Sequence, residues 1–282
     1  MSLFRRSVSG TTTAATIFIA LTIALATASP ASAAEWRPAT KRCTINDARL
    51  DEISGMSRST YPRKLRWVHN DSGDSARFFA VSKTCRVRAE FQVGVPEAVD
   101  WEDMAAGPDH TLWFGDIGDN GADRQTISVV RVKEPRVISS RRVKATVFRL
   151  AYPNGPRNAE GLMVQPRSGR VFVVTKSKVD KGAAIYRAPK VLSATRVNVM
   201  NKVMSGAPRG LSSADWRPGG KGFFLGGYNG IWVYDSFASA PKVVSFDAAV
   251  DFIEAVAWTR SGTAVSLTGE GVGKPLWLMR RR

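Results

Sequence analysis

The sequence predicts an all-β fold: a five-bladed β-propeller that an N-terminal outer strand closes. One layout repeats five times, with 48, 58, 53 and 41 residues between equivalent positions. Each repeat contains several short runs rich in β-branched and aromatic residues, which is the composition of strands. No window shows the 3.6-residue periodicity of a sustained helix. Four strands in a repeat of about 40 to 50 residues are typical of a propeller blade.

Each repeat begins with an acidic or seryl residue inside a short apolar run. These first runs occupy residues 53–56, 101–104, 159–162, 213–216 and 253–256. A turn and a second run follow, at residues 65–68, 112–114, 171–174, 223–225 and 264–267. We therefore expect the first two strands of every blade at these positions.

A third run follows in every repeat, and a fourth in the first four. The third runs occupy residues 78–81, 128–132, 185–186, 231–234 and 276–278, and fourth runs occur for example at 87–93 and 145–150. The fifth repeat ends at Arg282 without a fourth run, and residues 42–46 precede the first repeat without a partner. We therefore expect this N-terminal segment to complete the last blade. An aligned β-sandwich with a fortuitous internal similarity is the alternative.

The first 34 residues resemble a secretory signal peptide. A basic start precedes an apolar stretch at residues 11–28, and small residues at 31–33 form a cleavage site. We expect a single propeller domain at residues 35–282 that is secreted, extracellular or cell-wall associated, with no membrane span after cleavage. An uncleaved membrane anchor is the alternative.

Cys43 and Cys85 are the only cysteines in the chain. Outside the cytosol a lone pair of cysteines favours a disulfide over a metal clip or redox motif. In the predicted propeller both lie on one rim, at the seam between the last and first blades. Closing a loop of this length stabilises a fold by roughly 4 kcal/mol in the chain-entropy model. Two unpaired thiols are the alternative.

Acidic and hydroxyl side chains recur at the start of the first strand, which lines the central channel of a propeller. They are Ser54, Glu102, Glu160, Ser213 and Glu254. Three carboxylates in a narrow channel must take up protons, find cations or bind a metal, and no Lys or Arg occupies the equivalent position. Oxygen ligands suit Ca²⁺, which takes about six to eight of them. A solvated acidic channel, or one holding Na⁺ or Mg²⁺ weakly, is the alternative.

The order Ser, Glu, Glu, Ser, Glu in five successive repeats resembles the calcium-activated nucleotidase (apyrase) family. The resemblance rests on Ser54-Gly55, Trp101-Glu102, Glu160, Leu211-Ser212-Ser213 and Glu254-Ala255. It implies a five-bladed propeller whose central Ca²⁺ is held by Ser54, Glu102, Glu160, Ser213 and Glu254. The chain is also similar to uncharacterised secreted bacterial propeller proteins through residues 69–74 and 115–120. Two loops depart from the nucleotidase pattern, so nucleotide specificity is not implied.

Polar, Gly-rich loops follow the second strand of each repeat and return to the channel mouth. Asp71 and Asp116 are the candidates to orient an attacking water in a metal-assisted phosphoester hydrolysis. The candidates for substrate binding are Asp74, Asp119, Lys176, Arg209, Tyr228 and Glu270. Ordinary hairpin turns are the alternative for each loop, because Gly, Asp and Asn are also the usual turn residues.

The formal net charge is +17, and Arg and Lys cluster at residues 58–66, 131–144 and 280–282, outside the mouth loops. This separation of charge predicts attraction to a small anionic substrate or to a cell-envelope polyanion. Solubility alone is the alternative. We do not expect a nucleic-acid partner, because no recognition motif is present. We expect a monomer.

Two functions follow from these residues. The first is a secreted calcium-binding propeller that acts as a Ca²⁺-dependent hydrolase on a phosphorylated or anionic small molecule. The second is a noncatalytic extracellular binding scaffold whose ion is purely structural. A carbohydrate-active propeller, which would use a pair among Asp71, Asp116 and Glu270, is a third and weaker hypothesis.

Overall fold

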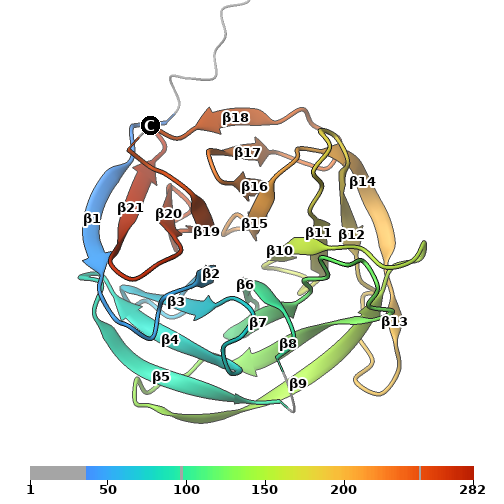
Figure 1. The fold of residues 1–282 in the computed structure, drawn as a ribbon, viewed down its shortest axis with the longest axis horizontal. Helices are drawn as coiled ribbons and strands as arrows, with labels where there is room; N and C mark the ends of the chain where they lie inside the picture. The colour runs from blue at the N-terminus through green and yellow to red at the C-terminus, as the bar shows by residue number, and fades with distance from the viewer. Residues whose placement is uncertain (1–35, 96–97, 248) are drawn as a thin grey trace, which may run out of the picture. The chain divides into compact units, whose positions relative to one another are not determined.

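The computed structural model describes residues 36–95, 98–247 and 249–282. The predicted signal peptide at 1–34 lies outside these residues. The described part of the chain consists of 21 strands in four sheets that stand around a common centre (Figure 1). It contains no helix, and therefore none that could cross a membrane. This confirms the all-β class that the sequence predicts.

The first two repeats form one mixed sheet. Its strands are β2 (Ile53–Arg58), β3 (Leu65–Asn70), β4 (Arg77–Ser82), β5 (Val87–Gly94), β6 (Trp101–Gly107), β7 (Thr111–Asp116), β8 (Ile127–Lys133) and β9 (Arg141–Ala151). Each repeat contributes four antiparallel strands, and the two groups join where β5 pairs with β9 in parallel. The short strand β13 (Asn198–Val199) also pairs with β9.

The other three sheets have four antiparallel strands each. One contains β10 (Ala159–Val164), β11 (Val171–Thr175), β12 (Ala183–Arg187) and β14 (Asn201–Ala207), and the next contains β15 (Leu211–Trp216), β16 (Phe223–Gly227), β17 (Gly230–Tyr234) and β18 (Lys242–Ser245). The last contains β19 (Ile253–Trp258), β20 (Ala264–Gly269), β21 (Lys274–Arg280) and the N-terminal β1 (Thr40–Ile45). Because β1 pairs with β21, the N-terminal segment supplies the fourth strand that the last repeat lacks.

The first strands of the five repeats form the innermost layer of the fold (Figure 1). Each of them contacts the next, from β2 through β6, β10, β15 and β19 and back to β2. Every residue of β2, β6, β10 and β15 is buried. The outer strands carry many exposed residues. The arrangement is therefore propeller-like, with the inner strands around the axis.

Apolar clusters fill the spaces between neighbouring groups of strands. In one of them Trp67 is fully buried and meets Phe78 edge-on, with ring centroids 5.4 Å apart. Fully burying one large side chain contributes roughly 1.5 to 3 kcal/mol, and ring pairs add to that. The packing of these large apolar side chains therefore contributes strongly to the stability of the fold.

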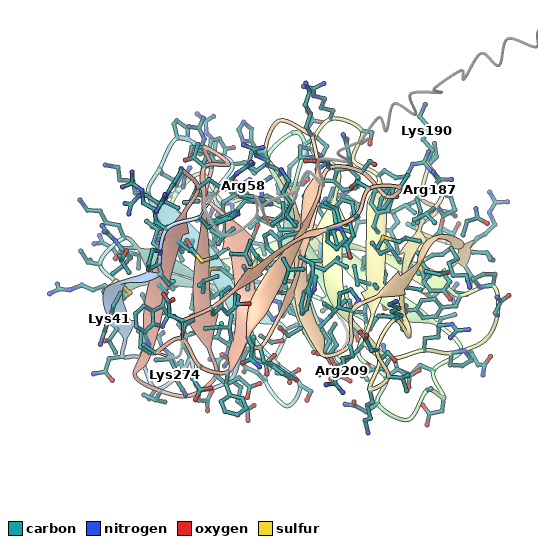
Figure 2. The ribbon with its side chains drawn as sticks, turned by 90° about the horizontal axis from the view of Figure 1, so that it is seen from above. Lys41, Arg58, Arg187, Lys190, Arg209 and Lys274 are labelled. Carbon is teal, nitrogen blue, oxygen red and sulfur yellow. A yellow bond between two sulfur atoms is a disulfide. The ribbon has the colours of Figure 1, made fainter. Side chains whose placement is uncertain are left out.

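The strands give the fold two distinct ends. The inner strands begin at the end that we name the mouth, where the loops after β3, β7, β11, β16 and β20 also lie. They finish at the opposite end, which we name the far face. Figure 2 shows Arg58, the last residue of β2, on the far face, and Arg209, which precedes β15, on the mouth side.

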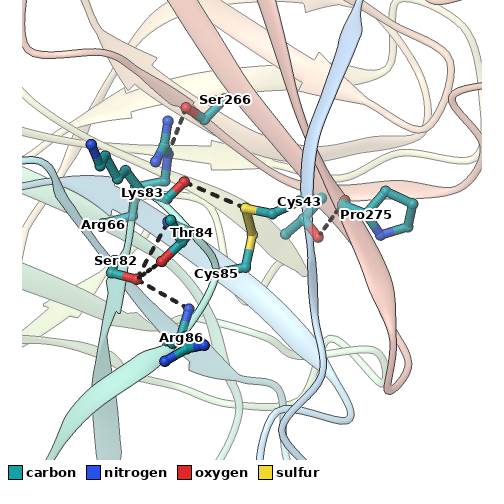
Figure 3. The surroundings of a disulfide bond; sticks show 10 residues. Cys43, Arg66, Ser82, Lys83, Thr84, Cys85, Arg86, Ser266 and Pro275 are labelled. Atoms are coloured by element: carbon teal, nitrogen blue, oxygen red, sulfur yellow. Dashed lines mark hydrogen bonds between the residues drawn. A yellow bond between two sulfur atoms is a disulfide. The ribbon is translucent and has the colours of Figure 1, made fainter.

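A disulfide between Cys43 and Cys85 crosses the seam between the last and first sheets (Figure 3). Cys43 lies on β1 and Cys85 in the turn between β4 and β5. The predicted pairing is thus confirmed. The closed loop spans 42 residues, which corresponds to roughly 4 kcal/mol in the chain-entropy model. Such bonds are typical of proteins in oxidising compartments.

Candidate functional site

Each inner strand has a β-bulge near its mouth end. In β6, Trp101 pairs with Asp116 and Asp103 with Gly115, so Glu102 is an extra residue between two pairs. The same irregularity falls on Ser54, Glu160, Ser212 and Glu254. A bulge changes the direction of the extra side chain and is common beside functional sites. The recurring acidic or seryl residue is therefore the bulge residue of its strand.

In β15 the bulge falls on Ser212 rather than on Ser213. Leu211 pairs with Gly227 and Ser213 with Gly226, which leaves Ser212 between them. Its Oγ donates to the Ile253 carbonyl at 3.2 Å, much as Ser54 Oγ donates to the Glu102 carbonyl at 2.6 Å. In the strand register, the residue equivalent to Ser54 is therefore Ser212, one position before the Ser213 that the sequence pattern selects. Ser213 keeps a buried Oγ with no hydrogen-bond partner in the described structure.

Glu102 lies in an acidic cluster with Asp71 and Asp100. One carboxylate oxygen from each of the three lies within 4.8 Å of the others. Burial raises the pKa of Glu102 to about 11, and repulsion from Glu160, Asp71 and Asp100 adds to the effect. The pKa of Asp100 is raised to about 6, by burial and then by Asp71. In the absence of a cation, these carboxyl groups therefore favour the protonated, neutral form.

Asp100 is a member of this cluster that the sequence pattern does not reveal. It directly precedes the first residue of β6, as Glu52 precedes β2, but Glu52 is not part of the cluster. The loop after β7 supports Asp100, because the amides of Ile117 and Gly118 donate to its carbonyl at 3.0 and 3.2 Å. This loop passes so close that a Cβ on Gly118 would overlap the carboxylates of Asp100 and Glu102. Residues 115–120 thus form one wall of the cluster.

Glu160 differs from Glu102 in having a cationic partner. Lys176 Nζ lies 3.0 Å from Glu160 Oε1, and Asn158 Nδ2 donates to the same oxygen at 3.2 Å. Burial acts to lower the pKa of Lys176, but Glu160 and Tyr228 together outweigh it, so that the pKa is raised. The ammonium also lies 5.6 Å from the centre of the Tyr228 ring. The sequence predicts that Lys176 binds the substrate. The structure shows that Lys176 forms an ion pair with Glu160.

Glu254 and Glu270 extend the acidic surface of the mouth. Burial raises the pKa of Glu254 to about 8, and Glu270 is the next largest cause. Glu270 is exposed, and its pKa is raised by partial burial and by Asp71. The mouth therefore gathers five carboxylates from Asp71, Asp100, Glu102, Glu254 and Glu270 around the Glu160–Lys176 pair.

Three of the predicted site residues hold turns together. Asp116 accepts from Arg124 Nη2 at 2.8 Å, Asp119 accepts the amides of residues 123 and 124, and Asp74 accepts Arg77 Nε at 2.8 Å. These contacts are the ones expected of ordinary hairpin turns, which is the alternative given for these loops. By contrast, the only hydrogen bond to the Asp71 carboxylate within the described residues comes from the Ser72 amide.

A groove of 1320 Å³ lies between the sheets of β14 and β17, beside the mouth. The predicted binding residues Lys176, Arg209 and Tyr228 all line it, whereas Asp74, Asp119 and Glu270 do not. Further cations and aromatic rings complete the lining: Lys178, Lys181, Trp232, Tyr234 and Phe237. Cations beside aromatic faces suit an anionic molecule that has a ring. Asp180 is the one carboxylate among the described lining residues.

No family model and no curated protein matches the sequence. Among solved structures, the chain is similar to a gluconolactonase from Xanthomonas campestris with 12% identity and a TM-score of 0.51, over 90% of this chain and 88% of that one. It also aligns with the hydrazine synthase of Kuenenia stuttgartiensis with 16% identity and a TM-score of 0.43, over 79% and 56% of the two chains. The first likeness supports a propeller-like fold, and the second is too weak to carry an argument.

Proposed function

We propose that this protein is a secreted five-bladed propeller that binds Ca²⁺ at its mouth and hydrolyses a phosphorylated or otherwise anionic small molecule. Five blades are supported by the closed cycle of contacts among β2, β6, β10, β15 and β19. Secretion is supported by the disulfide and by the signal-like N-terminus. A monomer remains the expected state.

The observation that carries the proposal is the shortage of positive charge around Glu102. Asp71 and Asp100 crowd it, and the nearest lysine, Lys176, pairs with Glu160. The available metal ligands are carboxylate and hydroxyl oxygens, which suit Ca²⁺ rather than a softer metal. Glu102, Glu160, Asp71 and Asp100 would hold the ion, and Ser54, Ser213 and Glu254 are the further ligands that the sequence pattern proposes.

When bound, Ca²⁺ supplies the positive charge that polarises a phosphoryl or carbonyl oxygen. Asp71 is the best candidate to orient a water and accept its proton, because its carboxylate has few other partners. Asp116 was the other candidate, and its bond to Arg124 leaves it less suited to this task. Lys176 and Arg209 would bind the anionic oxygens of the substrate, and Tyr228 would contact its ring.

Sugar lactones form a second substrate class within the same proposal. The similar solved structure is a gluconolactonase, and lactone hydrolysis needs the same polarised oxygen and directed water. Trp232 and Tyr228 in the groove offer flat faces for a sugar ring.

The proposal is tested by measuring turnover on a panel of nucleoside phosphates, sugar phosphates and sugar lactones, with Ca²⁺ and with a chelator. We expect turnover that requires Ca²⁺, that Glu102→Gln abolishes, and that the control Glu90→Gln on the outer strand β5 retains. If nothing turns over while Ca²⁺ still raises the melting temperature, the scaffold alternative replaces the enzyme. If Ca²⁺ changes neither, the calcium site itself is rejected.

A further inference from the structure

A second cavity opens on the far face, remote from the acidic mouth. It has a volume of 520 Å³ and lies where β2, β19 and β21 end. The turns between β2 and β3 and between β19 and β20 contribute to its wall. Arg58, which lines it, appears on the opposite side of the molecule from Arg209 in Figure 2.

The lining of this cavity is strongly basic. Eight of its sixteen described lining residues are Arg or Lys and none is Asp or Glu. The eight are Arg42, Arg58, Arg63, Lys64, Arg66, Lys83, Arg260 and Arg280. The residues come from both sides of the seam between the first and last sheets, so folding itself brings these like charges together against their repulsion.

Only one of these cations is neutralised within the described structure. Arg58 pairs with the buried Asp215 at 3.0 Å, whereas the other seven form no ion pair with a described carboxylate. The nearby carboxylate of Glu134 does not line the cavity. It is already engaged, because it accepts from Ser59, from the Thr60 amide at 2.8 Å and from Trp67 Nε1 at 3.0 Å.

Arg66 is the cation that most needs an anion. It is half-buried and lies directly opposite Arg58 in the β2–β3 pairing, and like charges at such positions are unfavourable. Its one described hydrogen bond runs from Nε to Ser266 Oγ at 2.8 Å, which leaves the terminal nitrogens for a ligand. Burial and then Arg42 lower the pKa of Arg66 to about 10.

We propose that this cavity binds an anion that carries two or more adjacent phosphate groups. Guanidinium groups match phosphate oxygens with paired hydrogen bonds. Six of the eight cations are arginines, and five of these six have no carboxylate partner because only Arg58 is paired. The hydroxyls of Ser261 and Ser266 in the lining can donate to further oxygens. Several unpaired cations at one site favour a ligand with several negative charges. The site is separate from the mouth, so it does not depend on the proposed hydrolysis.

The test is calorimetric titration of tripolyphosphate into the purified protein in metal-free buffer at 0.15 M NaCl. We expect saturable binding that the double variant Arg42→Gln/Arg260→Gln weakens at least about tenfold, because two charged contacts are lost. The control Arg187→Gln/Lys190→Gln removes the same charge from exposed residues outside the lining and should change affinity less than about twofold. Unchanged melting temperatures would show that both variants fold.

The absence of saturable binding would overturn the proposal. So would equal weakening by both double variants, because it would indicate diffuse attraction to a basic surface. Citrate binding as tightly as tripolyphosphate would also overturn the proposal, because the site would then bind any multivalent anion without selecting phosphate groups. A parallel titration with a glycerol phosphate oligomer distinguishes the source of the phosphates. Tighter binding of the oligomer points to an envelope polymer, and tighter binding of tripolyphosphate points to a soluble anion. Glu102→Gln should leave either affinity unchanged.

Discussion

Glu102 and Asp103 are neighbours on β6, both buried, and their surroundings are opposite. Asp103 accepts backbone amides from Met104 at 2.7 Å, Leu162 at 2.9 Å and Ala214 at 3.0 Å. The Glu102 carboxyl instead hydrogen-bonds to another acid, Glu160. Because the bulge turns adjacent residues in different directions, one acid joins three inner strands and the other faces the mouth. Burial of a carboxylate does not by itself indicate a ligand site. A buried carboxylate indicates one when no protein group donates hydrogen bonds to it.

Asp215 on β15, like Asp103, is a buried acid that accepts hydrogen bonds from other inner strands. It accepts the Trp258 amide at 3.0 Å and Arg58 Nη1 at 3.0 Å. These contacts join β15 to β19 and to β2, across the innermost layer of the fold. The inner strands are thus fixed by satisfied acids away from the mouth, while no described amide, lysine or arginine donates to the carboxylates of Glu102 and Asp100.

The largest effect is expected when a satisfied acid loses its partner. Arg58→Met leaves Asp215 buried without its cation, which should lower the free energy of unfolding by about 3 to 5 kcal/mol. Urea unfolding measures this loss. The double variant Arg58→Met/Asp215→Leu should recover most of it, because no unpaired charge remains. A single variant as stable as the native protein would mean that the pair does not hold the inner strands.

Removal of the disulfide should cause the next largest loss in the free energy of unfolding. Cys43→Ser/Cys85→Ser opens the 42-residue loop and should reduce stability by about 2 to 4 kcal/mol. Thermal unfolding of the variant and of the native protein, each with and without reductant, measures it. The reductant should lower the melting temperature of the native protein alone. An equal effect on both proteins would contradict a stabilising role at this seam.

At the mouth, Glu102→Gln should separate folding from metal binding. The metal-free variant should be about as stable as the native protein, because a glutamate with a pKa of about 11 is already neutral there. Ca²⁺ at a hundred times its Kd stabilises by about 2.7 kcal/mol, or roughly 5 to 10 °C in a chain of this size. We expect that increase in the native protein and not in Glu102→Gln. An equal increase in both would remove Glu102 from the site.

The smallest effect is a pH dependence of the metal-free protein. Folding raises the pKa of Asp100 from 3.8 to about 6 and that of Glu254 from 4.5 to about 8. The folded state therefore binds more protons than the unfolded chain between about pH 4 and pH 8, and its stability falls as the pH rises. Melting temperatures at several pH values should decline by a few degrees, and Ca²⁺ should flatten the slope. A melting temperature that rises over this range would contradict the account.

The fold was predictable because its signals repeat. The strand runs recur in each repeat, and the lack of a fourth run after residue 278 indicated that residues 42–46 complete the last sheet. The pairing of Cys43 with Cys85 followed from that closure. The order of acids and serines at the inner strands also repeats, and its physical cause is a bulge in each strand.

The remaining features of the site depend on geometry that no pattern repeats. Ser212 and Ser213 are identical in sequence, and only the strand register assigns the bulge to Ser212. Asp100 and Glu52 both directly precede an inner strand, and only the fold shows that Asp100 joins the cluster. The pairing of Lys176 with Glu160 joins a loop to an inner strand. The turn contacts of Asp74 and Asp116 likewise depend on the partners that the loops bring to them.

Diffraction from Ca²⁺-loaded crystals, with an anomalous difference map, tests the central claim most directly. The account predicts one strong peak at the mouth, bounded by the carboxylates of Glu102, Glu160, Asp71 and Asp100. Crystals of Glu102→Gln grown under the same conditions should lack it. An empty mouth in the native crystals, or a peak bound only at another part of the molecule, would contradict a cation site among these acids.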